Sequence, residues 1–123
     1  MPSESTLGIY IHVPFCVRKC PYCDFYSVPQ TAERMEQYGT ALCRFLRQMQ
    51  TDLPVDTIYF GGGTPSLLPV SLLEEILQTI DKTVSLQQPE ITLECNPATV
   101  NRETLQQFQE IGINRLSIGV QSL

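Results

Sequence analysis

The sequence predicts an α/β fold, the N-terminal part of a (β/α) barrel with parallel strands. Short strand patterns alternate along the chain with segments that carry apolar residues at helical spacing. This alternation is typical of βαβ units, in which a helix connects two parallel strands. One face of the predicted strands is largely polar, whereas a sheet covered by helices on both sides should be apolar on both faces. The polar face favours a curled sheet that lines a cavity, with the working end at the strands' carboxyl termini.

Four strands and three helices are expected in order. The strands are predicted over 8–13, 56–60, 90–94 and 114–121, and the helices over 32–49, 70–84 and 101–111. Ser71 and Asn101 are the expected N-caps, and Gly112 closes the third helix. The face expected to meet the helices consists of Ile9, Ile11, Val13, Ile58, Phe60, Ile91, Leu93, Leu116, Ile118 and Val120. The polar face consists of Tyr10, His12, Thr57, Tyr59, Thr92, Glu94, Arg115, Ser117 and Gln121.

The 123 residues are expected to form one unit, residues 1–123, without an internal domain boundary. No helix pattern follows the fourth strand, so we expect the first portion of a larger core domain. The net charge of −5 argues against a broad nucleic-acid surface. No run approaches the ~20 apolar residues of a membrane span, and the first residues do not resemble a signal peptide. The expected compartment is therefore the cytosol, where spaced cysteines indicate metal binding or catalysis before disulfides.

Three cysteines follow the first predicted strand within eight residues, at Cys16, Cys20 and Cys23. Thiolates hold the iron of [4Fe-4S] clusters, and three protein ligands leave one of the four irons open for another ligand. The same thiolates together with His12 could instead bind zinc. Structural zinc sites more often show two separated cysteine pairs, so the spacing favours the iron–sulfur cluster.

Further polar groups stand where later strands are expected to end. The triple glycine 61–63 follows the second strand, and glycines there let a ligand approach the backbone closely. Glu94 ends the third strand on the polar face, where it could accept hydrogen bonds from an ammonium or from ribose hydroxyls. Alternatively, Glu94 is a solvated carboxylate at a strand end. Arg115 could bind a carboxylate or pair with Glu94, and the sequence does not decide between the two.

These motifs together resemble the radical S-adenosylmethionine (SAM) superfamily. The segments YIHVPFC, CPYCDF, GGGTPS, ECNP and GINRLSIGVQS are similar to its subgroup of oxygen-independent coproporphyrinogen III dehydrogenases and heme chaperones. The resemblance covers nearly the whole chain. It implies that Cys16, Cys20 and Cys23 bind a [4Fe-4S] cluster and that SAM chelates the fourth iron. It also implies that reduction cleaves SAM to a 5′-deoxyadenosyl radical.

The resemblance further implies a set of residues around SAM. They are Tyr10, Tyr22, Gly62, Gly63, Thr64, Glu94 and Gln121. For Tyr10 and Tyr22 the alternative is ordinary aromatic packing. His12 is the only histidine and is assigned no catalytic role, while Cys43 and Cys95 are expected to be small buried residues.

The residue at position 25 helps to distinguish the dehydrogenases from the heme chaperones within this subgroup. The dehydrogenases typically carry a further cysteine two residues after the third cluster ligand, whereas this chain has Phe25, similar to the heme chaperones. The resemblance therefore favours a heme chaperone, with heme or porphyrin bound beyond Leu123 and with an electron donor and a heme acceptor as protein partners. A coproporphyrinogen III dehydrogenase, a structural zinc module and a tRNA-modifying enzyme are the alternatives, in that order.

Overall fold

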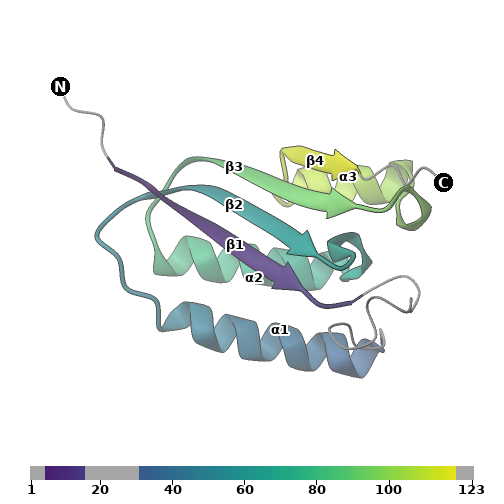
Figure 1. Ribbon diagram of the computed structural model, residues 1–123, viewed down its shortest axis with the longest axis horizontal. Coiled ribbons are helices and arrows are strands. Elements are labelled where there is room, and N and C mark those ends of the chain that lie inside the picture. The colour runs from purple at the N-terminus through teal and green to yellow at the C-terminus, as the bar shows by residue number, and fades with distance from the viewer. Residues whose placement is uncertain (1–4, 16–30, 119–123) are drawn as a thin grey trace.

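The computed structural model describes residues 5–15 and 31–118 of the chain (Figure 1). There it forms one parallel sheet of four strands in the order β1-β2-β3-β4. The strands are β1 (Leu7–Val13), β2 (Val55–Gly62), β3 (Leu86–Cys95) and β4 (Arg115–Ile118). The helices are α1 (Ala32–Arg47), α2 (Val70–Thr83) and α3 (Arg102–Glu110), with short 3-10 turns at η1 (Pro65–Leu67) and η2 (Pro97–Thr99).

The strand order explains the single helical layer. Each connection moves to the next strand in the same direction, and right-handed crossovers then place every helix on the same face of the sheet. Figure 1 shows α1 and α2 side by side along that face, with α3 beyond α2 next to β4. A doubly wound sheet would reverse its strand order and carry helices on both faces. The predicted order of a (β/α) barrel is therefore confirmed for these strands.

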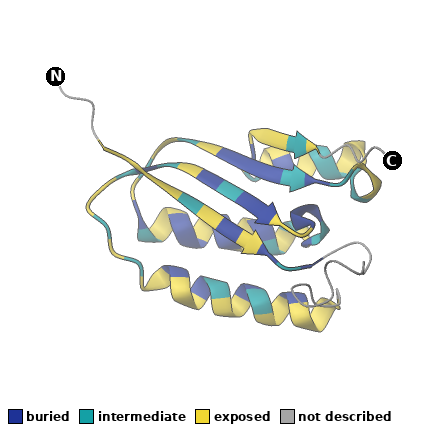
Figure 2. Ribbon diagram, viewed as in Figure 1, coloured by how far each residue is buried: buried dark blue, intermediate teal, exposed yellow. Residues whose placement is uncertain are grey.

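The helix-facing residues of the first three strands form the core, as predicted. Val13, Ile58, Phe60 and Leu93 are fully buried in the core cluster. Figure 2 shows buried segments along β2, β3 and α2 in dark blue. The prediction was wrong for β4. Leu116 and Ile118 are 37% and 52% exposed, because β4 is an edge strand among the described residues.

The polar face is buried at one position. Thr92 is only 1% exposed. It lies in register between Tyr59 on β2 and Arg115 on β4, and these two larger side chains flank it.

Two strands are longer than the sequence indicated. The prediction began β3 at Glu90 because Pro89 removes a backbone donor from the ladder. In the structure β3 begins at Leu86, and the β2–β3 register shifts where Gln88 adopts a φ of 42°. This irregularity accommodates the proline and lets pairing resume on its far side. β2 continues through Gly61 and Gly62, which pair with β1, so these glycines belong to a strand rather than to a turn.

The helix ends match in part. Asn101 caps α3, since its side chain accepts a hydrogen bond from the Thr104 N–H at 2.8 Å, and Gly112 follows that helix with a φ of 112°. The predicted N-cap Ser71 is wrong, because α2 begins at Val70 with Pro69 at the cap position. The helices in the described ranges are too short and too polar to cross a membrane.

Candidate functional site

A groove lies at the carboxyl ends of β2, β3 and β4. Its volume is about 660 Å³. The residues that line it are Gly62, Gly63, Thr64, Pro65, Glu94, Cys95, Asn96, Pro97, Ala98 and Ser117. Four predicted SAM contacts are thus brought together, although the glycine segment and Glu94 lie on different strands. Glu94 is the one charged residue among the groove-lining residues that the structure describes.

Both carboxylate oxygens of Glu94 are held by the protein. The Tyr59 hydroxyl donates to Oε2 at 2.7 Å, and the Gly62 N–H donates to Oε1 at 3.1 Å. Hydrogen bonds to an ionised acceptor are stronger than neutral ones and fix its orientation. A carboxylate offers about four lone-pair positions, so about two remain for donors of a ligand in the groove.

The glycine segment uses its N–H groups inside the protein. Beside the Gly62 bond to Glu94, the Gly63 N–H donates to the Val13 carbonyl at 2.7 Å and the Thr64 N–H to the Phe15 carbonyl at 2.6 Å. An anion would need such donors. With these three N–H groups committed, the polar backbone groups left to meet a ligand are carbonyl oxygens, of which the Thr64 carbonyl also accepts from the Leu67 N–H at 3.0 Å. The segment is therefore suited to an N–H or O–H donor rather than to an anion.

The glycines are required by the chain's own packing as well as by any ligand. A Cβ on Gly62 would lie 2.7 Å from the His12 ring and 2.8 Å from the Val13 carbonyl oxygen, and the φ of Gly62 is 109°. A Cβ on Gly61 would lie 2.8 Å from the Tyr10 hydroxyl oxygen. The close approach expected for this segment is therefore partly an approach of β1 side chains across the sheet.

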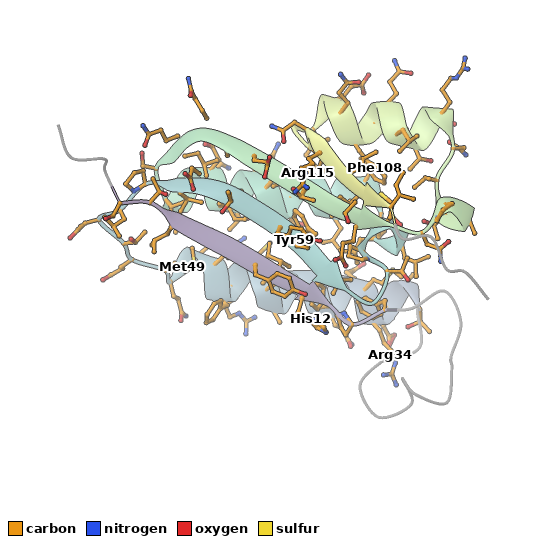
Figure 3. All side chains as sticks on the ribbon, turned by 45° about the horizontal axis from the view of Figure 1, so that its top comes forward. His12, Arg34, Met49, Tyr59, Phe108 and Arg115 are labelled. Atoms are coloured by element: carbon orange, nitrogen blue, oxygen red, sulfur yellow. The ribbon has the colours of Figure 1, made fainter. Side chains whose placement is uncertain are left out.

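Tyr10 stands on the open face of the sheet and is 60% exposed. Its ring stacks on that of Tyr59, with centroids 5.8 Å apart, and lies 6.4 Å from the His12 ring. Figure 3 shows His12 and Tyr59 on neighbouring strands. The packing alternative for Tyr10 thus has a partner, yet most of the ring remains accessible.

The described part of β1 leads directly to the cysteine segment. Phe15, the residue before Cys16, is buried and packs edge-on against Tyr38 of α1, with centroids 5.6 Å apart. The Tyr38 hydroxyl donates to the His12 carbonyl at 2.6 Å, and burial raises the pKa of Tyr38 to about 12, so this donor stays protonated at neutral pH. Because the Phe15 carbonyl accepts from the Thr64 N–H, the last described residue before Cys16 lies beside the glycine segment.

Several predicted site residues lie outside the described residues. They are Cys16, Cys20, Tyr22, Cys23 and Gln121, together with Phe25. Their roles stay predictions, as does the choice between an iron–sulfur cluster and zinc.

One alternative for Arg115 is corrected. Arg115 pairs with Glu90 at 3.8 Å rather than with Glu94. Its register partner on β3 is Thr92, two residues before Glu94, and Ser117 takes the place opposite Glu94. Both members of the Arg115 pair are more than half exposed, so the pair contributes little to stability.

Sequence reasoning missed two features of the site. The first is the contact between Tyr59 and Glu94. The second joins the two 3-10 turns: Ser66 and Thr99 share a hydrogen bond of 2.5 Å, and the Asn96 N–H donates to the Ser66 hydroxyl at 3.4 Å. Asn-Pro at 96–97 is a helix-start signal that could have indicated η2, since the Asn96 side chain caps it.

The two described cysteines are buried, as expected. Cys43 and Cys95 are 1% and 5% exposed, and burial raises the pKa of the Cys95 thiol to about 11. Although Cys95 lines the groove, at pH 7.5 roughly one such thiol in three thousand is ionised, and the thiolate is the reactive form.

We therefore expect Cys43 and Cys95 to escape anaerobic alkylation by iodoacetamide in the folded protein and to react fully in guanidinium chloride. Peptide mass mapping at several reaction times measures both. Native labelling of Cys95 at the denatured rate would contradict its burial.

The singly wound sheet, with a groove at the carboxyl ends of its strands, defines a protein of the (β/α)-barrel class. The family model of the Radical SAM superfamily matches residues 10–123, and the chain belongs to this superfamily.

Similar proteins include the heme chaperone HemW of Haemophilus influenzae, 39% identical over 99% of this chain and 34% of that protein. HemW of Escherichia coli is 40% identical over 94% of this chain and 32% of that protein. The solved structure of E. coli coproporphyrinogen III oxidase (HemN), a radical SAM enzyme, superimposes with a TM-score of 0.85 at 26% identity. It covers 98% of this chain and 29% of HemN. The chain therefore spans about a third of the length of these relatives.

Proposed function

We propose that this chain is part of a heme chaperone that binds a [4Fe-4S] cluster and SAM. The similarity to proteins named as heme chaperones carries the proposal: two of them are 39% and 40% identical over more than nine-tenths of the chain. Phe25, in place of the further cysteine typical of the dehydrogenases, supports the same subgroup. Residues 1–123 are the first portion of the radical SAM core domain in this proposal, and heme binds elsewhere in the protein.

The hydrogen-bond acceptors of the groove fit SAM. SAM carries an amino group, a carboxylate, a sulfonium and two ribose hydroxyls, so it presents several hydrogen-bond donors and a positive sulfonium. The groove offers Glu94, with about two free lone-pair positions, and a glycine segment whose N–H groups are already used. Carbonyls of Gly62, Gly63 and Thr64 would accept from the amino N–H groups. The Thr64 carbonyl would do so through the lone pair that the Leu67 N–H leaves free. Glu94 would accept from further donors. Bound to a reduced cluster, SAM supplies radical chemistry.

The remaining roles follow from the same resemblance. Cys16, Cys20 and Cys23 hold the cluster, and Phe15, which precedes them, is hydrogen-bonded to Thr64. Tyr10, Tyr22 and Gln121 contribute further contacts to SAM. A reducing compartment such as the cytosol suits a thiolate-ligated cluster, and reduction requires an electron donor protein. The protein that accepts heme is a separate partner.

A second function has an observation in its favour. The structural similarity to HemN, with a TM-score of 0.85, is compatible with oxidative decarboxylation of coproporphyrinogen III. Two anaerobic assays on the full-length, cluster-loaded protein distinguish the functions: heme binding followed by absorbance, and turnover of coproporphyrinogen III with SAM and a reductant. We expect stoichiometric heme binding and no vinyl product. Clear vinyl product would contradict the chaperone proposal.

A further inference from the structure

We propose that Tyr59 is a positioning residue that holds the Glu94 carboxylate in its ligand-binding orientation and thereby raises affinity for SAM. The inference rests on the proposed SAM site. Tyr59 comes from the middle of β2 and Glu94 from the end of β3, and their side chains meet through a hydrogen bond. Figure 3 shows Tyr59 on the open face of the sheet. The hydroxyl donates to Oε2 over 2.7 Å, a short bond of the kind expected for a charged acceptor.

Glu94 depends on this bond because, among the described residues, only one other hydrogen bond holds its carboxylate. The side chain is half-buried and has several rotatable bonds, which are costly in entropy to restrain. In the structure one oxygen is held by the Gly62 N–H and the other by Tyr59. Without the hydroxyl, Oε2 loses its described partner. The carboxylate is then held only by the hydrogen bond from the Gly62 N–H and can rotate about it. Its two free lone-pair positions would then no longer be directed at one place in the groove.

Tyr59 is itself held in place by its ring. The ring stacks on Tyr10 at an interplanar angle of 17°, with centroids 5.8 Å apart. A phenylalanine at position 59 would keep this stacking and lose only the hydroxyl. The hydrogen bond to Glu94 raises the pKa of the Tyr59 phenol, so this donor is protonated throughout the neutral range.

The test is a double-mutant cycle on the full-length, cluster-loaded protein. The single variants are Tyr59→Phe, Glu94→Gln and Glu94→Ala, the double variant combines Tyr59→Phe with Glu94→Ala, and the readout is the dissociation constant of SAM from anaerobic equilibrium dialysis. We expect Tyr59→Phe to weaken binding roughly tenfold, the loss typical of one hydrogen bond to a charged group. Alanine removes the acceptor of the Tyr59 hydroxyl, whereas glutamine keeps one. Because Tyr59 acts through Glu94, the double variant should bind no more weakly than Glu94→Ala alone.

Two controls separate this effect from damage to the fold. Thr57→Val removes one hydroxyl from the same strand and the same face, at an exposed position two residues earlier, and should leave the SAM dissociation constant within twofold. Iron and sulfide content and the melting temperature should be equal in the wild type and all variants. A merely structural role for Tyr59 would change these values as well.

The possible results separate the role of Tyr59 from the existence of the SAM site. Wild-type affinity in Tyr59→Phe, with weakened binding in Glu94→Gln, would refute the inference and leave the SAM site standing. Additive losses in the double variant would also refute it, since Tyr59 would then act independently of Glu94. A wild-type protein that carries its cluster and binds no SAM would overturn the proposed function and the inference together.

Discussion

Replacing Cys20 with alanine is expected to abolish cluster assembly and, as a consequence, SAM binding. In the proposed site three thiolates are the only protein ligands, and a cluster left with two of them is not retained. After anaerobic reconstitution of the full-length protein, iron and sulfide per chain should fall to background in Cys20→Ala. The visible absorption of the cluster should be lost with them.

The matched control for Cys20→Ala is Cys43→Ala. Cys43 is a buried thiol of α1 that accepts a hydrogen bond from Thr79 of α2 at 3.5 Å, away from the groove-lining residues. Its loss should cost about 1 kcal/mol of stability and leave the iron content unchanged. Full iron and sulfide in Cys20→Ala would contradict the ligand assignment. Zinc without iron or sulfide in the wild type would instead establish the zinc alternative.

Replacing Gly62 with alanine is expected to destabilise the protein by roughly 3 kcal/mol and to remove SAM binding. Two costs add. A residue other than glycine is strained at a φ of 109°, and the new Cβ would lie 2.8 Å from the Val13 carbonyl oxygen, a backbone atom that no rotamer change can move. Relief requires the end of β2 to shift, and this shift withdraws the N–H that holds Glu94. Urea denaturation and SAM dialysis measure the two effects.

Gly112→Ala is the matched control for Gly62→Ala, because it introduces the backbone strain of a positive φ without the steric clash. Gly112 has a nearly identical φ of 112°, but its added Cβ would meet only the Ile91 Cδ1 atom, at an ordinary 3.8 Å. This variant should lose about 1–2 kcal/mol, the cost of the backbone conformation alone, and should bind SAM normally. Equal stability losses in the two variants, with SAM binding retained in both, would show that the close approach at Gly62 does not matter.

The order and type of the elements could be predicted because each depends on local pattern. Apolar residues at helical spacing identified α1 and α2, and Asn101 and Gly112 marked the two ends of α3. The start of β3 could not be found in this way. Pro89 is a correct local signal against a strand, but an irregular register beside Gln88 overrides it, and register depends on the neighbouring strand.

The same limit applied to the site. Glu94 was identifiable as a polar residue at a strand end. Its partner Tyr59 lies 35 residues away and is brought close only by the parallel pairing of β2 with β3. The exposure of Leu116 and Ile118 could not be predicted either. The alternation of apolar and polar residues indicates on which face of a strand a residue lies, but it does not indicate whether that face is covered.

The most direct test of the central proposal is the electron paramagnetic resonance spectrum of the reduced full-length protein, recorded anaerobically with and without SAM. If the three cysteines leave one iron open and the groove beside Glu94 presents SAM to it, adding SAM must change the coordination of that iron. We expect a [4Fe-4S] signal whose g-values shift on addition of SAM, and a weaker response at the same SAM concentration in Glu94→Gln. A reduced cluster whose spectrum is unchanged at millimolar SAM would contradict the proposal.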